Sequence, residues 1–240
     1  MIKDILTVMW KESKGMLRHR GSRARFLVIL LAPFLLTVIF PLKHGAAWVQ
    51  GLDSIFIAVF FPITLVSITI PNSFAGERER KTLETLLASR LPDRAILFGK
   101  VAISVALAWG ATLASIFVGL VIVNVAHWEG HLLLLTPTLF LADVIVSFLL
   151  ATLAAGAGVL ISLRSQTVQE AMQTLTAVVL LPPMLLGMLL TALSDQVREI
   201  AGNLKSEQIL LMVVIFLAVI DLVVFFEMMT HFRRSRMYLD

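Results

Sequence analysis

Six long runs of apolar residues divide this chain of 240 residues, and they restrict its fold more than any other feature. The runs are Phe26 to Leu42, Ile55 to Phe74, Phe98 to Val125, Pro137 to Leu163, Thr174 to Leu193, and Ile209 to Thr230. A bilayer core of about 30 Å requires about 20 apolar residues in a helix. Only 15% of the residues are charged, against about 25% in soluble domains. We therefore predict an all-α integral membrane protein with six transmembrane helices.

Prolines interrupt the first and the fifth of these runs. Pro33 and Pro41 lie in the first, and Pro182 and Pro183 lie in the fifth. A spanning helix tolerates proline where neighbouring groups satisfy the freed carbonyls, so kinks within a bundle are expected. Residues 182–206 form either the rest of a full span or a re-entrant hairpin on the outer side. Pro182 and Pro183 are candidates for the wall of a transport pathway, and the alternative is an ordinary kinked span.

Positive charges predict the orientation of the chain. All but three of its 20 lysines and arginines precede the first run, lie between the second and third runs, or follow the fourth and sixth. The exceptions are Lys43, Arg198 and Lys205. Cytoplasmic segments carry an excess of positive charge. We predict one multi-pass transmembrane domain over residues 1–240, in the plasma (inner) membrane, with both termini in the cytoplasm.

Residues 1–25 have the pattern of an amphipathic helix. Apolar residues such as Ile5 and Met9 recur at helical spacing, and Lys3, Lys11 and Lys14 fall on the opposite face. Such a helix lies among the inner headgroups, where each basic side chain adds about 1 kcal/mol on anionic lipid. We predict an entry helix that contacts membrane lipids. The alternative is a basic leader that only sets the topology.

The longest predicted cytoplasmic loop lies between the second and third runs, and residues 77–91 in it predict a short helix. Its candidate contact residues are Glu77, Arg78, Glu79, Arg80, Lys81, Thr82, Leu83, Glu84, Leu86 and Leu87. The leucines form one apolar edge, acidic residues lead, basic residues trail, and Pro92 ends the helix. A helix tethered between two spans can serve as a lever for a soluble partner. The alternative is a linker helix that only connects the two spans.

Three strings in this loop, Glu77-Arg78-Glu79, Thr82-Leu83-Glu84 and Leu86-Leu87, precede Ile96-Leu97-Phe98-Gly99-Lys100 at the start of the third run. With them, the segment from Phe74 to Lys100 resembles the ABC-2 type permease family, the membrane subunits of ABC exporters. The order of entry helix, six spans and loops extends the resemblance over the whole chain. Many members carry glycine where Lys81 stands.

The resemblance implies that residues 77–89 form a coupling helix seated in an ATPase subunit. It implies a second cytoplasmic contact between Ser162 and Glu170, with Arg164, Gln166 and Glu170 as its polar residues. The implied assembly is a homodimer of this chain with two copies of the ABC ATPase subunit. ATP and Mg would be bound by that partner, and substrate would move outward between the two permease copies.

Motifs for covalent chemistry are missing from the sequence. It has no G-x-x-x-x-G-K-[ST] string, because Gly99-Lys100 lacks the upstream glycine, and it has no cysteine. His127 and His131 flank Glu129, but a complete set of metal ligands is not evident. We predict no catalytic residue, no metal, no cofactor in this chain, no nucleic-acid partner and no enzymatic activity of its own.

Acidic residues inside the predicted spans are the last candidates. Asp143, Asp221 and Glu227 lie in or near the hydrocarbon, where a charge costs at least about 2.5 to 3.5 kcal/mol. For Glu227 we expect an ion pair with Arg233 or Arg234. Asp143 and Asp221 either line a pathway or make structural contacts between helices. They also define an alternative function, a self-sufficient secondary carrier or channel, and a membrane anchoring subunit is a third.

Overall fold

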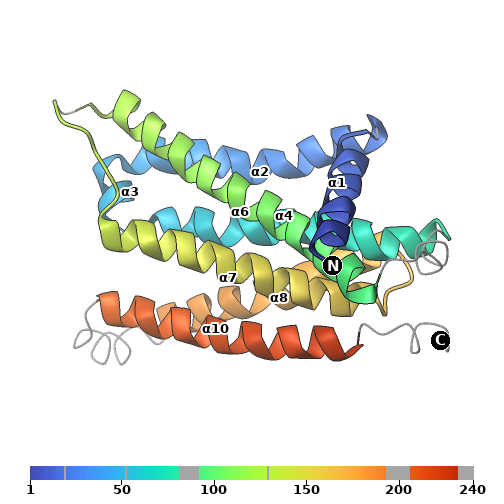
Figure 1. The fold of residues 1–240 in the computed structure, drawn as a ribbon. Helices are drawn as coiled ribbons and strands as arrows, with labels where there is room; N and C mark the ends of the chain where they lie inside the picture. Colours follow the sequence, from blue (N-terminus) through green and yellow to red (C-terminus); the bar gives the residue numbers. More distant parts are fainter. Residues whose placement is uncertain (19, 52, 82–91, 129, 193–205, 232–240) are drawn as a thin grey trace.

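The computed structural model describes residues 1–18, 20–51, 53–81, 92–128, 130–192 and 206–231, and in these ranges every regular element is a helix. The helices are α1 (Ile2–Arg18), α2 (Arg20–His44), α3 (Ala46–Gln50), α4 (Asp53–Glu79), α6 (Asp93–Ala126), α7 (Pro137–Ser162), α8 (Val168–Ala192) and α10 (Ser206–His231). The direction of the long helices alternates along the chain, so that α1 and the end of α10 lie at the same end of the bundle (Figure 1).

The two ends of the bundle differ in charge. One end carries Arg78, Lys100 and Arg164, and we call it the basic end. The opposite end, which we call the far end, holds the ion pair between His44 Nδ1 and Asp53 Oδ2 at 2.7 Å. Gly45, next to His44, packs against the ring of His127 at the end of α6.

Within the part of the chain that the structure describes, four helices are long and apolar enough to cross a membrane: α4, α6, α7 and the Leu210–His231 part of α10. Helices α2 and α8 contain the predicted first and fifth spans and have 25 residues each, which is roughly 38 Å of helix. In α2 the described apolar segment is the shorter Pro33–His44. The all-α membrane protein is confirmed, and the number of six spans stays a prediction.

Helix α4 occupies the centre of the bundle, where it packs against α2, α6, α7 and α8. Small residues of α7 permit the close approach of its neighbours. A Cβ atom on Gly158 would lie 2.9 Å from both Ile70 of α4 and Leu175 of α8, and one on Gly156 would lie 2.8 Å from Val224 of α10. Helix α10 lies against α7 and exposes most of its apolar side chains, as expected for a helix that faces lipid or a partner.

The helix boundaries observed at the basic end differ from two of the predicted ones. Residues 20–25 belong to the long helix α2 and not to the entry helix, which ends at Arg18. Residues 77–79 continue α4 instead of starting a separate helix, because the N–H of Arg80 still donates to the carbonyl of Gly76 at 3.2 Å. Lys81 then turns the chain with a φ of 57°. The predicted contact residues Thr82, Leu83, Glu84, Leu86 and Leu87 lie outside the described residues.

The two adjacent prolines do not end the fifth predicted span. Helix α8 continues through Pro182 and Pro183 to Ala192, and Pro182 is exposed. Residues 193–205, which make up most of the segment considered for a re-entrant hairpin, lie outside the described part of the chain.

Candidate functional site at the basic end

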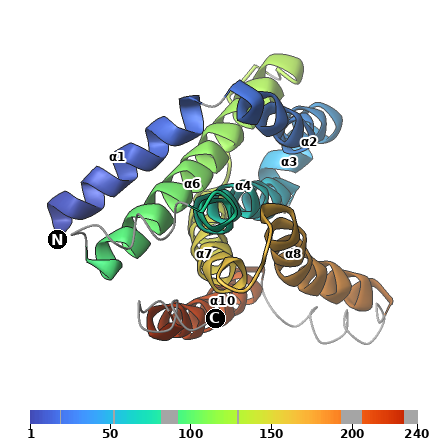
Figure 2. The ribbon, with the colours of Figure 1, turned by 90° about the vertical axis from the view of Figure 1, so that its right-hand side faces the viewer.

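Helix α1 lies at the basic end, steeply inclined to the long helices in Figure 1 and beside α6 in Figure 2. It lies directly on α6. Val8 is buried there, and a Cβ atom on Gly99 would lie only 2.6 Å from the Cβ of Val8 and 3.1 Å from the carbonyl oxygen of Ile5. Glycine at position 99 therefore allows the two helices to touch, and α1 is a packed part of the bundle.

Lys100, the next residue, is almost completely buried, with 1% of its side chain exposed. Its ammonium group lies 2.7 Å from the carbonyl oxygen of Ser73, 3.0 Å from Oε1 of Glu12 and 3.0 Å from Oε1 of Glu77. An ammonium group has three N–H donors, so these three acceptors satisfy it. The ring of Phe74 lies 5.3 Å away and adds a cation–π contact.

The carboxylates of Glu12 and Glu77 have further partners besides Lys100. The hydroxyl of Ser73 donates to Oε2 of Glu12 at 3.3 Å, and Nζ of Lys11 lies 3.6 Å from Oε1 of Glu77. Glu12 belongs to α1, Ser73 and Glu77 to α4, and Lys100 to α6. We call these four residues the Lys100 cluster. Because removing one partner of a buried ion pair costs about 3–5 kcal/mol, the cluster is a strong connection among three helices.

Arg78 connects the same end of α4 to a fourth part of the chain. Its Nη1 donates to the carbonyl oxygen of Ser165 at 3.3 Å, in the connection between α7 and α8. This connection contains the predicted second contact, so the two predicted contact segments adjoin. Arg78, Glu79, Arg80 and Lys81 are exposed.

The residues of the predicted second contact are also exposed, but two of them have a structural role. Oε2 of Glu170 accepts from the N–H of Gln166 at 3.0 Å, and the hydroxyl of Thr167 accepts from the N–H of Glu170 at 3.2 Å. These bonds satisfy free N–H groups at the start of α8. Arg164 lies beside them and is exposed.

The predicted role of Glu77 and its observed position differ. Among the predicted contact residues that the structure describes, Glu77 faces inward to Lys100, with 14% of its side chain exposed. Sequence reasoning missed Glu12, Ser73 and Lys100. Glu12 could have been recognised as a carboxylate on the same helical face as the apolar residues Ile5 and Val8. Lys100 could have been recognised as a cation just inside an apolar run.

The two candidate pathway acids on α7 and α10 do not share a site. Asp143 is fully buried near the far end, and its polar neighbour within the described residues is the hydroxyl of Ser54 of α4, which faces the carboxylate without forming a well-aligned hydrogen bond. Asp221 accepts a hydrogen bond from the hydroxyl of Thr152 at 2.7 Å. Asp143 and Thr152 are nine residues apart on α7, which separates the two contacts by roughly 14 Å along the helix.

Glu227 lies near the basic end of α10. Its Oε2 is 3.3 Å from Nδ1 of His231, one turn further along the same helix. Arg233 and Arg234, which were the predicted partners of Glu227, lie outside the described residues. An interfacial ion pair with either arginine stays a prediction.

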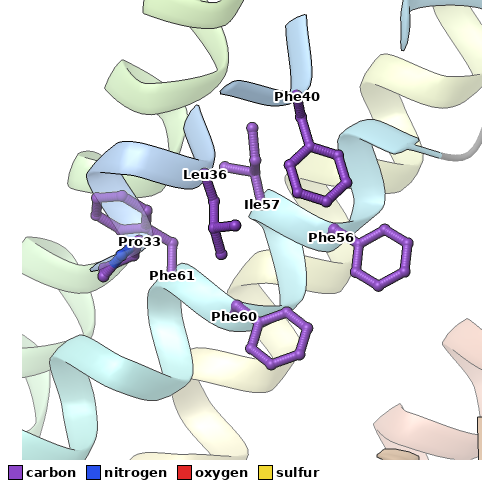
Figure 3. A pocket seen from close by; sticks show the side chains of 7 residues that line it. All are labelled: Pro33, Leu36, Phe40, Phe56, Ile57, Phe60 and Phe61. Atoms are coloured by element: carbon purple, nitrogen blue, oxygen red, sulfur yellow. The ribbon is translucent and has the colours of Figure 1, made fainter. Parts of the chain in front are cut away.

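An apolar groove between α2 and α4 is lined by Pro33, Leu36, Phe40, Phe56, Ile57, Phe60 and Phe61 (Figure 3). Its cavity volume is about 10 Å³, far below the range of about 300–1,000 Å³ that is usual for a drug-sized ligand. Among the residues that the structure describes, no three His, Asp or Glu side chains are grouped to hold a metal ion.

The long apolar helices and the ion-paired helix across their ends define a multi-pass, all-helical membrane protein. Residues 3–197 match the family model described as ABC-2 type transporter, and the chain belongs to this family. It is thus a transmembrane component of an ABC-type transporter. No relative is detected among the curated proteins.

Proposed function

We propose that this chain is the permease subunit of an ABC exporter, which moves a substrate outward with ATP hydrolysed by a separate subunit. The family supports this proposal, and so does the absence of a nucleotide-binding string from the sequence. The observation that carries it is the attachment of α4 at the basic end. Its last turns are tied to α6 through Lys100 and to the α7–α8 connection through Arg78.

The surface proposed for the ATPase subunit consists of residues 78–91 together with Arg164, Gln166 and Glu170. The charged side chains of residues 78–81 are exposed next to the exposed second segment. The excess of positive charge at this end supports a cytoplasmic position for it. On this proposal the chain spans the plasma (inner) membrane six times, with both termini in the cytoplasm.

The mechanism follows from these attachments. Closure of two ATPase subunits on ATP displaces residues 80–91, and the bonds of Glu77 and Arg78 pass the displacement to α6, α7 and α8. Two copies of the chain then alternate between inward and outward access, with the pathway between them. Asp221, Pro182 and Pro183 are its proposed wall, whereas Asp143, the other pathway candidate, faces Ser54 inside one copy. An apolar wall with few charges suits a lipid, an amphiphilic drug or a peptide.

Co-purification with ABC ATPase subunits from the same source tests this function. The double variant Glu84→Arg and Leu87→Asp reverses a charge and places an acid on the apolar edge of the proposed coupling segment. Lys43→Glu with Val125→Asp makes the same kinds of change on exposed residues of the far end, and it is the matched control. We expect the first variant to lose ATPase association and the control to keep it. Association and ATP hydrolysis that survive the first variant contradict the proposal.

A second candidate function, a self-sufficient proton-coupled carrier or channel, is favoured by one observation. Asp143 is a completely buried acid within an apolar helix, with the hydroxyl of Ser54 as its polar neighbour among the described residues. Intramembrane acids mark proton or ion pathways in many transporters. Liposomes that contain the chain without ATPase, loaded with a pH-sensitive dye, separate the two functions. Proton flux that disappears in Asp143→Asn supports the carrier, and no flux supports the exporter subunit.

A further inference from the structure

Helix α1 is attached to the two helices that flank the proposed coupling segment, and the carboxylate of Glu12 forms its ion pair with Lys100. We infer that Glu12 is a positioning residue for coupling: it locks α1 to α4 and α6 through Lys100, so that α1 moves with them when the ATPase subunit displaces residues 80–91. This inference rests on the proposed function for the source of the movement. The locked state itself does not depend on it.

The Lys100 ammonium is the centre of the lock. Its acceptors come from two other helices: Ser73 and Glu77, one turn apart on α4, and Glu12 on α1. The side chains of Glu12 and Glu77 are only 12% and 14% exposed, so water has little access to replace a lost acceptor. Without the Glu12 carboxylate, one N–H donor of a buried cation loses its partner, which is costly.

Packing and charge fix α1 in complementary ways. Val8 and Glu12 are one turn apart on α1, and they contact the adjacent residues Gly99 and Lys100 of α6. An apolar contact such as Val8 on Gly99 is non-directional and tolerates sliding or rotation of one helix on the other. The ion pair is directional and fixes the register, because moving α1 by one turn would separate Glu12 from Lys100 by about 5 Å.

The opposite side of α1 stays available to the membrane. Ile2, Leu6 and Trp10 follow one another at one-turn spacing and are each more than half exposed, and Nζ of Lys14 lies 3.7 Å from the ring centre of Trp10. Helix α1 is therefore held to the bundle by Glu12 on one face. On another face it presents an apolar stripe and lysines that can contact the lipid surface. The view along the bundle shows α1 beside the start of α6 (Figure 2).

Spin labelling tests this inference directly, because the chain has no cysteine that would have to be removed. Lys3→Cys on α1 and Arg94→Cys on α6 are exposed positions on the two helices. Double electron–electron resonance would give the distance distribution between them in reconstituted permease, alone and with the ATPase subunit before and after addition of ATP and vanadate. With Glu12 present, we expect one narrow distribution that ATP leaves unchanged.

Glu12→Gln removes the charge and preserves the shape of the side chain. We expect about a twofold broader distribution in the permease alone, and a shift on addition of ATP and vanadate, because the ion pair no longer holds the register. Asp4→Asn is the matched control, since Asp4 is an acid of the same helix whose partner is the amino terminus at 2.9 Å. It should leave the distribution narrow.

Two results would overturn the inference: a distribution in Glu12→Gln as narrow as that of the unsubstituted chain, or a shift on ATP with Glu12 intact. If Glu12→Gln is not recovered folded, Glu12→Asp shortens the side chain and keeps its charge, and the same broadening is expected. Failure of the proposed function has a different signature. The unsubstituted chain would then not bind the ATPase subunit, whereas the broadening in the permease alone would still occur.

Discussion

Two buried charged residues at opposite ends of the bundle have contrasting surroundings. Lys100 of α6 and Asp143 of α7 are 1% and 0% exposed. The ammonium of Lys100 has three acceptors within 3.0 Å, from two other helices. The carboxylate of Asp143 has the hydroxyl of Ser54 as its polar neighbour within the described residues, and no cation lies beside it there.

The contrast separates two reasons for burying a charge. Removal of either group from water costs several kcal/mol. At the basic end, partners on α1 and α4 offset this cost, so Lys100 stabilises the arrangement of helices on which the proposed coupling depends. At the far end, the hydroxyl of Ser54 is the polar neighbour of Asp143 among the described residues, so we expect the cost to be offset less completely than at Lys100. A charge whose burial is less completely offset is the better candidate for a pathway role.

The largest effect is expected from Lys100→Met, which leaves Glu12 and Glu77 largely buried with the exposed Lys11, 3.6 Å from Glu77, as a remaining cation beside them. We expect the free energy of unfolding to fall by about 3–5 kcal/mol, measured by denaturant titration in mixed micelles. Lys14→Met is the control, because Lys14 is exposed and its contact with Trp10 is worth about 0.5–1 kcal/mol. Equal losses in both variants would mean that the partners of Lys100 do not stabilise the bundle.

Gly99→Leu tests whether α1 is packed against the bundle or only tethered near it. Any side chain at position 99 meets Val8 and the backbone of Ile5, so α1 must be displaced and the Glu12–Lys100 pair weakened. We expect a loss of about 1–3 kcal/mol in the same titration. On the same helix, a Cβ atom on Gly110 would have no described atom within 4 Å, and Gly110→Leu should be nearly neutral. A neutral Gly99→Leu would show that α1 is free of α6.

Asp143→Asn removes the charge at the far end and keeps the volume of the side chain. Because the carboxylate has no cation beside it among the described residues and an amide oxygen can still face Ser54, we expect stability to be unchanged or raised by about 1 kcal/mol, while ATP-dependent export falls. Asp221→Leu is the comparison, since it removes the acceptor of the hydrogen bond from Thr152. A loss of stability in Asp143→Asn as large as that in Lys100→Met would remove the contrast between the two ends.

Sequence reasoning predicted the features that depend on neighbours along the chain. Helices α4, α6, α7 and α10 follow from apolar runs of sufficient length. Because successive helices run in opposite directions, the segments around Arg78 and Ser165 were expected at the same end of the bundle, where they contact each other. The Lys100 cluster could not be predicted in this way. Glu12 and Lys100 are 88 residues apart, and only the tertiary packing of α1 on Gly99 brings them together.

The end of α4 shows a second limit of sequence reasoning. Composition changes from apolar to charged at Glu77, which suggested the start of a new element, but the helical hydrogen bonds continue for several residues. Helix ends are set by backbone geometry and by capping contacts, and a change of polarity on one face does not interrupt them. The inward position of Glu77 follows from this continuation, because it lies one turn beyond Ser73 on the face of α4 that meets Lys100.

The smallest effect is expected from Lys81→Gly, which compares an exposed lysine with the buried Lys100. Lys81 has a φ of 57°, the left-handed region in which a side chain costs about 1–2 kcal/mol and glycine is favoured. Glycine also makes the unfolded chain more flexible, so we expect a net gain in stability of about 1 kcal/mol or less. Lys81→Ala keeps the strained backbone and removes only the charge, and it should leave stability unchanged. If alanine stabilises as much as glycine, charge repulsion at the basic end and not backbone strain limits the stability of this turn.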